Sequence, residues 1–180
     1  MALILEKLTF PFQYGNALLQ SGPTKNPTAL RLGVISTANI NAAAGMYLHC
    51  TNLKADWPLT FRSVIHPVET HPDVILYAIG SRSYESAHEY AQKYKFAKAY
   101  GSYQEVLDDE AVDIVYVSTP NGMHFEWAAK AMEKGKHVLC EKPFTANGAE
   151  ARKLLEIASR KHVLLLEAVC VHLPARGECM

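Results

Sequence analysis

The sequence lacks the patterns that mark several large classes of protein. Its 4 cysteines, Cys50, Cys140, Cys170 and Cys179, include no C-x-x-C pair, which argues against a structural zinc site and a disulfide framework. The longest apolar run, around Val163–Leu166, is far too short to cross a membrane. The 18 basic and 18 acidic residues balance and form no basic block. This composition argues against a general binder of nucleic acid or of membrane surfaces.

A recognisable secretory leader is also missing. The first residues, Met1–Leu8, are apolar but carry Glu6 and Lys7 and no cleavage-like site. Together with the scattered cysteines, this predicts a protein of the reducing cytoplasm. The 180 residues suffice for one ordinary domain with a buried core, and 49% of them are hydrophobic, as in a globular protein.

The middle of the chain contains an alternation of strand and helix patterns. Five apolar runs predict buried strands, at Leu30–Ile35, Val74–Ile79, Ile114–Val117, Val138–Leu139 and Val163–Leu166. Three stretches between them, around residues 87–94, 125–132 and 151–158, repeat apolar residues at helical spacing. Gly135 is predicted to end the second helix, and Pro143 the fourth strand. The alternation predicts an α/β fold: a Rossmann-like parallel sheet with helices on both faces.

The turn after the first strand departs from the glycine-rich fingerprint of such domains. Residues Ser36–Asn41 stand where G-x-G-x-x-G/A would let the backbone approach a pyrophosphate at a helix N-terminus. Ser36 and Ala38 are small, but neither is glycine. The turn alone therefore leaves an ordinary strand–helix connection as an equal alternative.

The end of the second strand bears on the type of dinucleotide. Gly80 is followed there by Ser81, Arg82 and Ser83. An NAD site uses an acidic residue at this point, whereas an NADP site accommodates an arginine that holds the 2′-phosphate. No acid competes with Arg82, so NADP is favoured over NAD if the fold is right. An N-capping serine beside a surface arginine is the alternative.

A lysine directly follows the fourth strand, in Cys140-Glu141-Lys142-Pro143. A charge at the carboxyl end of a buried strand must be solvated by water, paired with an opposite charge, or involved in binding or catalysis. In open α/β sheets that edge is where ligands bind. Taken alone, the motif leaves a solvated lysine before a proline turn as the alternative.

Five segments carry a resemblance to a known family: Ser36–Ile40, Ser81–Ser83, Tyr100–Tyr103, Val117–His124 and Gly135–Pro143. Together they resemble the N-terminal domain of the Gfo/Idh/MocA oxidoreductases. The specific part is the pair Thr-Pro-Asn-x-x-His and Glu-Lys-Pro, in that order and spacing. The resemblance covers about residues 30–44 and 64–169. It is strongest to the branch of NADP-dependent D-xylose and dihydrodiol dehydrogenases, particularly the fungal ones.

The resemblance implies roles for individual residues. Lys142 would be the catalytic residue that polarises or helps deprotonate the substrate hydroxyl beside the nicotinamide, and a partly desolvated lysine there suits acid–base work. The residues implied in binding the cofactor, NADP, are Ser36, Thr37, Ala38, Asn39 and Ile40 at the pyrophosphate, Ser81 and Arg82 at the 2′-phosphate, and Thr119, Pro120, Asn121, His124, Glu141 and Lys142 at the nicotinamide end. For His124, a purely structural role at the start of a helix is the alternative. No metal site is implied.

Three stretches do not fit this family. Residues 1–29 read as an irregular lead-in to a dinucleotide-binding domain at 30–168. Residues 45–63 interrupt the helix that would receive the pyrophosphate. Their codons can spell an intron, so we interpret them as retained intron sequence, with a lineage-specific loop as the alternative. Residues 169–180 read as an aberrant tail.

The resemblance also implies that the chain stops before a sixth strand and before the substrate domain that supplies a second catalytic group. We therefore expect the NADP-binding domain of an oxidoreductase that acts on a sugar or a diol, inactive as this chain. Members of the family form dimers, which is in doubt for this chain, and no nucleic-acid or membrane partner is expected. The alternative is a non-catalytic NADP-binding remnant or a regulatory or scaffold module.

Overall fold

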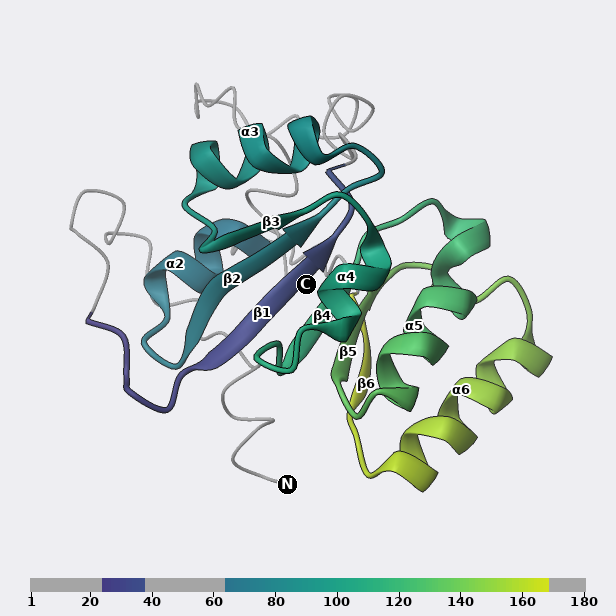
Figure 1. The fold of residues 1–180 in the computed structure, drawn as a ribbon. Coiled ribbons are helices and arrows are strands. Elements are labelled where there is room, and N and C mark those ends of the chain that lie inside the picture. Colours follow the sequence, from purple (N-terminus) through teal and green to yellow (C-terminus); the bar gives the residue numbers. More distant parts are fainter. Residues whose placement is uncertain (1–23, 38–63, 169–180) are drawn as a thin grey trace, which may run out of the picture.

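The six strands of the sheet lie within residues 24–37 and 64–168, the part of the chain that the computed structural model describes. They are β1 (Leu30–Ile35), β2 (Val74–Gly80), β3 (Lys98–Tyr100), β4 (Ile114–Val117), β5 (His137–Glu141) and β6 (Leu165–Ala168). Every pairing is parallel, and the spatial order is β3-β2-β1-β4-β5-β6. The predicted α/β fold with a parallel sheet is confirmed (Figure 1).

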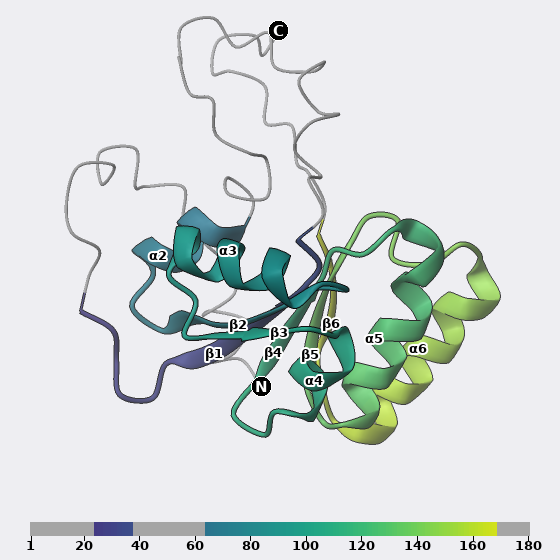
Figure 2. The ribbon, with the colours of Figure 1, turned by 45° about the horizontal axis from the view of Figure 1, so that its top comes forward.

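Helices cover both faces of this sheet. They are α2 (His66–Thr70), α3 (Tyr84–Tyr94), α4 (Tyr103–Asp108), the 3-10 turn η4 (Asn121–Met123), α5 (His124–Glu133) and α6 (Gly148–Lys161). Helices α2 and α3 lie on one face and α5 and α6 on the other, which Figure 2 shows most clearly. The three predicted helices correspond to α3, α5 and α6. Among the described residues, no helix is long and apolar enough to cross a membrane.

Local sequence determines where these helices begin and end. Ser83, Ser102 and Asn147 precede α3, α4 and α6, and each side chain accepts a hydrogen bond from a backbone N–H of the first turn. Gly135 follows α5 with a φ of 76°, the left-handed conformation that glycine favours, so it ends this helix as predicted.

The strands are apolar throughout because each contributes to a core on both faces. All four residues of β4 are buried. Ile114 and Tyr116 face the core beneath α2 and α3, whereas Val115 and Val117 face the core beneath α4, α5 and α6. This double burial explains why the strands read as continuous apolar runs in place of an alternating pattern.

Close packing of α4 against the sheet depends on two glycines. A Cβ placed on Gly33 of β1 would lie 2.8 Å from one methyl of Val106 in α4. A Cβ on Gly80 of β2 would lie 2.5 Å from the other methyl and 2.9 Å from the carbonyl oxygen of Ser102. One valine thus packs directly on the backbone of two strands.

The sheet differs from the predicted one at its edges. Strand β3 was not predicted, because Lys98–Tyr100 is a short edge strand with no apolar run. Strand β6 begins at Leu165, two residues later than predicted, since the N–H of Val163 donates to the end of α6 and that of Leu164 to the ring of His137. With β3 included, β6 is the sixth strand, and the expectation that the chain stops before a sixth strand is wrong.

Candidate functional site

The carboxyl ends of β1 and β4 lie side by side where the order of the strands reverses. From β1 the chain continues to β2 and β3 on one side, and it returns to β4, β5 and β6 on the other. In open α/β sheets, the crevice at this switch point is where ligands bind. The residues predicted from the sequence follow β1, β2, β4 and β5, so all of the described ones gather at this edge.

In the turn after β1, a serine has a backbone conformation that is typical of glycine. Ser36 is buried and has a φ of 124°, a conformation that glycine adopts far more readily than serine. Its N–H donates to the carbonyl of Gly80 at 3.0 Å. Thr37 then forms a hydrogen bond between its Oγ1 and the Oγ of Ser81, also at 3.0 Å. The turn after β1 is thereby fixed to the turn after β2.

Arg82 stands at the end of β2, directly before α3. Its neighbour Ser81 is buried and donates its backbone N–H to the carbonyl of Tyr100. The Arg82 side chain is exposed, and none of the ion pairs among the described residues involves it. An exposed guanidinium at the positive end of a helix suits the binding of a phosphate.

The turn after β4 contains a buried hydroxyl without a partner. Ser118 donates both its N–H and its Oγ to the carbonyl of Ile35, at 3.4 Å each, which ties β4 to β1. Thr119 is only 4% exposed, yet its Oγ1 has no hydrogen-bond partner among the residues that the structure describes. A buried hydroxyl left unpaired is costly, so this atom fits a ligand that can accept or donate a hydrogen bond. Pro120 and Asn121 are exposed beside it.

At the end of β5, Glu141 turns toward the protein and Lys142 toward solvent. One carboxylate oxygen of Glu141 accepts a hydrogen bond from the hydroxyl of Tyr116, and the other accepts the backbone N–H of Lys142 at 3.3 Å. The side chain of Lys142 is exposed, so the described residues do not desolvate it. Tyr116 was missed in the sequence, although a tyrosine in an apolar strand needs a partner for its hydroxyl. That need could have pointed to Glu141 at the end of the next strand.

The His124 side chain lies beneath these turns and is fully buried. Its Nδ1 is 2.8 Å from the carbonyl oxygen of Pro143, and its Nε2 is 2.7 Å from the carbonyl oxygen of Thr119. The ring contacts protein on both sides, which is the structural role that the sequence left open.

The structure thus assembles the predicted residues in two groups. Ser36, Thr37, Ser81 and Arg82 lie around the ends of β1 and β2. The other group lies around the ends of β4 and β5 and consists of Thr119, Pro120, Asn121, His124, Glu141 and Lys142. Ala38, Asn39 and Ile40 lie outside the described residues, as do the proposed insert 45–63 and tail 169–180. Within the part of the chain that the structure describes, no group of three or more His, Cys, Asp or Glu residues could hold a metal ion.

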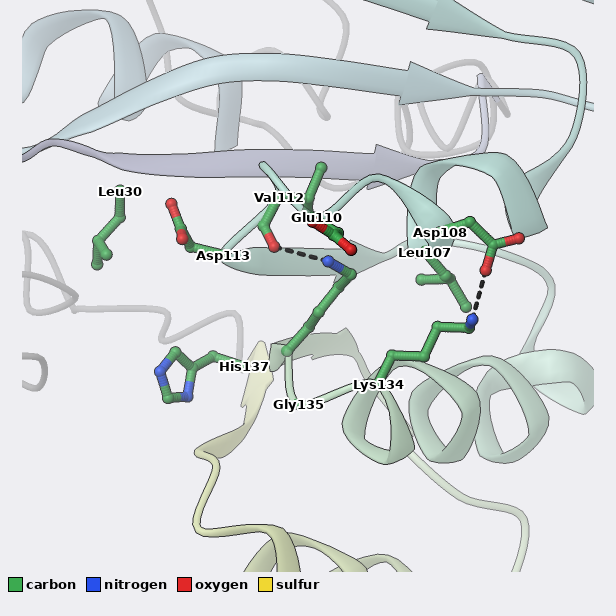
Figure 3. Close-up of a pocket in the computed structure, with 10 residues that line it drawn as sticks. Leu30, Leu107, Asp108, Glu110, Val112, Asp113, Lys134, Gly135 and His137 are labelled. Atoms are coloured by element: carbon green, nitrogen blue, oxygen red, sulfur yellow. Dashed lines mark hydrogen bonds and ion pairs between the residues drawn. The ribbon is translucent and has the colours of Figure 1, made fainter.

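A hollow of about 510 Å³ lies at the opposite edge of the sheet, between the beginnings of β1 and β5 (Figure 3). Both of its lysines already have partners in the protein. Lys134 pairs with Asp108 at 2.5 Å, and the buried Lys136 donates to the carbonyls of Asp109 and Val112, at 2.8 Å each. Because both lysines already have partners, they do not indicate a ligand site in this hollow.

Comparison with known families and structures places this architecture among dinucleotide-dependent enzymes. A family model described as an oxidoreductase family with an NAD-binding Rossmann fold matches residues 60–174, which is more than half of the chain. Solved structures agree. The 3-ketoreductase KijD10 from Actinomadura kijaniata, in complex with TDP-benzene and NADP, is 29% identical with a TM-score of 0.64, over 77% of this chain and 38% of that one.

Two curated relatives are similar over most of the chain. The D-xylose 1-dehydrogenase (NADP(+)) of Hypocrea jecorina is 38% identical over 147 residues, which is 80% of this chain and 35% of the relative. The trans-1,2-dihydrobenzene-1,2-diol dehydrogenase of Danio rerio is 36% identical over 141 residues, 78% of this chain and 37% of the relative. The chain therefore spans little more than a third of the length of these relatives.

Proposed function

Because the chain belongs to the Gfo/Idh/MocA family of oxidoreductases, which have an NAD-binding Rossmann fold, we propose that residues 30–168 bind NADP. We further propose that they form the nucleotide-binding domain of a dehydrogenase that acts on a sugar or a diol. The observation that carries the proposal is the switch point itself. The glycine-like backbone of Ser36 lies at the same edge of the sheet as the hydroxyl of Thr119, which has no hydrogen-bond partner among the described residues.

The residues present fit a dinucleotide. Ser36 and Thr37 would hold the pyrophosphate, since they follow β1 at the turn where this fold binds it. Thr119, Pro120 and Asn121 would line the nicotinamide end, where the Thr119 hydroxyl would gain the partner that it lacks among the described residues. Ala38, Asn39 and Ile40 keep the pyrophosphate role that the sequence predicts.

Arg82 supports NADP over NAD. Its guanidinium is exposed at the end of β2 and can form a forked pair with a 2′-phosphate, while Ser81 beside it is held in place by Thr37. No acidic residue occupies this point to accept the 2′-hydroxyl of NAD. The Hypocrea jecorina relative is a D-xylose 1-dehydrogenase (NADP(+)), and the KijD10 structure contains NADP.

Lys142 is the residue that we propose for acid–base work. The bound cofactor supplies hydride transfer. Lys142, at the end of β5, holds a proton on its Nζ that can move to or from the oxygen of the reacting carbon. Glu141 fixes the backbone at that point through the N–H of Lys142.

The substrate class follows from the relatives, one of which acts on D-xylose and another on a dihydrodiol. Because the matched part is little more than a third of each relative, we propose that residues 30–168 supply cofactor binding and that the remainder of the reaction needs residues outside them. The dimer, the cytoplasmic location and the retained intron stay predictions from the sequence.

Titration with NADPH and NADH tests the cofactor proposal. NADPH should bind the chain more tightly than NADH. The Arg82→Ala variant should bind NADPH about 10- to 100-fold more weakly, as the loss of hydrogen bonds to a charged group implies. Its affinity for NADH should stay within about twofold, because NADH has no 2′-phosphate. Arg152→Ala, an exposed arginine of α6, is the matched control and should change neither affinity.

Three results would separate the possibilities. Equal affinity for both nucleotides in the unaltered chain would refute the NADP preference. No binding of either would favour a scaffold module. Tight NADPH binding with no NADP reduction in the presence of D-xylose would fit a cofactor-binding part that needs further residues for turnover.

A further inference from the structure

His124 joins two turns that come from different strands. The ring belongs to the first residue of α5, and the two carbonyls that it contacts belong to Thr119, after β4, and Pro143, after β5. Thr119 is five residues away along the chain, but Pro143 is nineteen residues away. One contact is therefore local, whereas the other spans two adjacent strands.

Both contacts require the ring to donate. A carbonyl oxygen accepts hydrogen bonds and has no proton to give. A neutral imidazole has a single N–H, so it can satisfy one of these carbonyls and not the other. The contact with Pro143 spans two strands, and it needs the proton on Nδ1. His124 is 0% exposed, so water does not reach its ring.

We propose that His124 is a positioning residue for Lys142: with its ring between the two carbonyls and Nδ1 donating to Pro143, it holds the Pro143 carbonyl at a fixed distance from the Thr119 turn. This role rests on the function proposed above, in which Lys142 and Thr119 face the same nicotinamide. It differs from the direct cofactor contact that the family resemblance implies, because the buried ring has a protein carbonyl at each nitrogen.

The other restraints on this segment are few, which makes the His124 contact consequential. The Lys142 side chain is exposed, and its backbone N–H makes a 3.3 Å bond to the neighbouring Glu141. Beyond Pro143, the N–H of Phe144 donates to Glu167 of β6 at 3.1 Å. Neither bond relates the lysine to the turn after β4. His124 thus links the two turns themselves, in addition to the pairing of β4 with β5 and the bond from Tyr116 to Glu141, and small misplacements there are costly to catalysis.

The hydrogen-bonding state of the ring can be measured in the unaltered protein. Long-range proton–nitrogen NMR spectra of the imidazoles report whether each nitrogen carries a proton. We expect Nδ1 of His124, which faces the Pro143 carbonyl, to carry a proton. A spectrum in which Nδ1 is unprotonated would overturn the contact with Pro143. This measurement needs no variant and does not depend on NADP.

Two substitutions separate the two contacts. The amide nitrogen of asparagine falls near the position of Nδ1, so His124→Asn can still reach the Pro143 carbonyl. The amide nitrogen of glutamine falls near the position of Nε2, so His124→Gln can still reach only the Thr119 carbonyl. If His124 served just to start α5, the local contact retained by glutamine would matter more. The positioning role predicts the reverse order.

Protection of Lys142 is the readout. Brief acetylation with acetic anhydride, mapped by mass spectrometry, measures the reactivity of each lysine with and without NADPH. In the unaltered chain, NADPH should protect Lys142 and leave Lys153 of α6 unprotected. We expect His124→Gln to reduce the protection about 5- to 10-fold, the cost of a lost hydrogen bond, and His124→Asn to reduce it less than about threefold.

His137→Asn is the matched control, since the Nδ1 of His137 also bonds to a backbone group, the N–H of Leu164, but at the far end of β5. It should leave the protection of Lys142 unchanged. Equal protection in every variant would overturn the positioning role while the proposed function stands. No protection by NADPH in the unaltered chain would overturn the proposed function, and the role of His124 with it. Thermal unfolding of each variant identifies any that fail to fold, and the NMR result on the unaltered chain then still tests the contact with Pro143.

Discussion

Replacing Gly80 with alanine should destabilise the protein, because the side chain of Val106 in α4 and the carbonyl oxygen of Ser102 pack directly on the backbone of Gly80. The new Cβ would lie 2.5 Å from a methyl of Val106 and 2.9 Å from the carbonyl oxygen of Ser102. Both distances are shorter than ordinary van der Waals contact distances. The methyl can turn, but the carbonyl belongs to the residue that caps α4, so relief requires the whole helix to move.

Overpacking of a core costs about 1–3 kcal/mol, and a contact with fixed backbone places Gly80→Ala at the upper end, about 3 kcal/mol. For a domain of this size, that corresponds to a fall in Tm of roughly 10 °C. Alanine is otherwise well tolerated in place of glycine in a strand, so the backbone itself adds no cost.

Urea and thermal unfolding followed by circular dichroism would measure the effect. Gly101→Ala is the matched control, since its Cβ would meet nothing closer than 3.4 Å, and its stability should stay within about 0.5 kcal/mol of the unaltered protein. A Gly80→Ala variant as stable as Gly101→Ala would refute the close packing of α4 on the sheet.

Three further predictions concern buried polar groups. Desolvation raises the pKa of Asp109, but hydrogen bonds from Lys98, Tyr100 and the N–H of Ala111 outweigh it and hold the pKa at about 2. Because the folded pKa lies below the unfolded value near 3.9, the carboxylate stabilises the fold above pH 3.9, and this stabilisation is lost as the pH falls through about 2. The unfolding free energy of Asp109→Asn should therefore be about 2 kcal/mol lower than that of the unaltered protein at neutral pH, and the two should converge in acid. Lys136→Met should cost about 2–4 kcal/mol in urea unfolding, since it leaves the buried carbonyls of Asp109 and Val112 unpaired, and an equal cost for the exposed Lys153→Met would contradict this. Burial, with the nearby charges of Glu141 and Glu167, raises the pKa of the Cys140 thiol to about 12. Iodoacetamide at pH 8 should therefore label this thiol only after unfolding, and rapid labelling of the folded protein would show that the thiol is accessible.

The strands that form the centre of the sheet could be predicted because burial on both faces leaves a simple signal. The runs Leu30–Ile35 and Ile114–Val117 match β1 and β4 to the residue. Strand β3 escaped because an edge strand is buried less, and Lys98–Tyr100 has a charged residue and a tyrosine bonded to Asp109 in place of an apolar run. Helix α4, with six residues, is too short to show a helical period.

The site was predictable as a set of positions and not as a set of contacts. Strand ends are visible in sequence, so Arg82, Thr119 and Lys142 could be placed at one edge of the sheet. The conformation of Ser36 could not be read from a serine, because it is imposed by the pairing of its N–H with Gly80. His124 and Pro143 are nineteen residues apart, and their contact depends on how α5 and the turn after β5 are placed relative to each other, which no local pattern encodes.

The pairing of β1 with β4 also bears on the order in which the molecule folds. Strands β4 and β5 are close in sequence, since the hydrogen-bonded residues Tyr116 and Glu141 are 25 residues apart. Joining β1 to β4 closes a far longer loop, since Arg31 bonds to Asp113 across 82 residues. Loop-closure entropy makes the longer closure about 1 kcal/mol less favourable, and non-local pairing is slow. We therefore expect the half that carries Thr119, His124 and Lys142 to form first. The crevice at the switch point then appears only when β1 docks, so a folding intermediate can hold the lysine in place before it can hold a nucleotide.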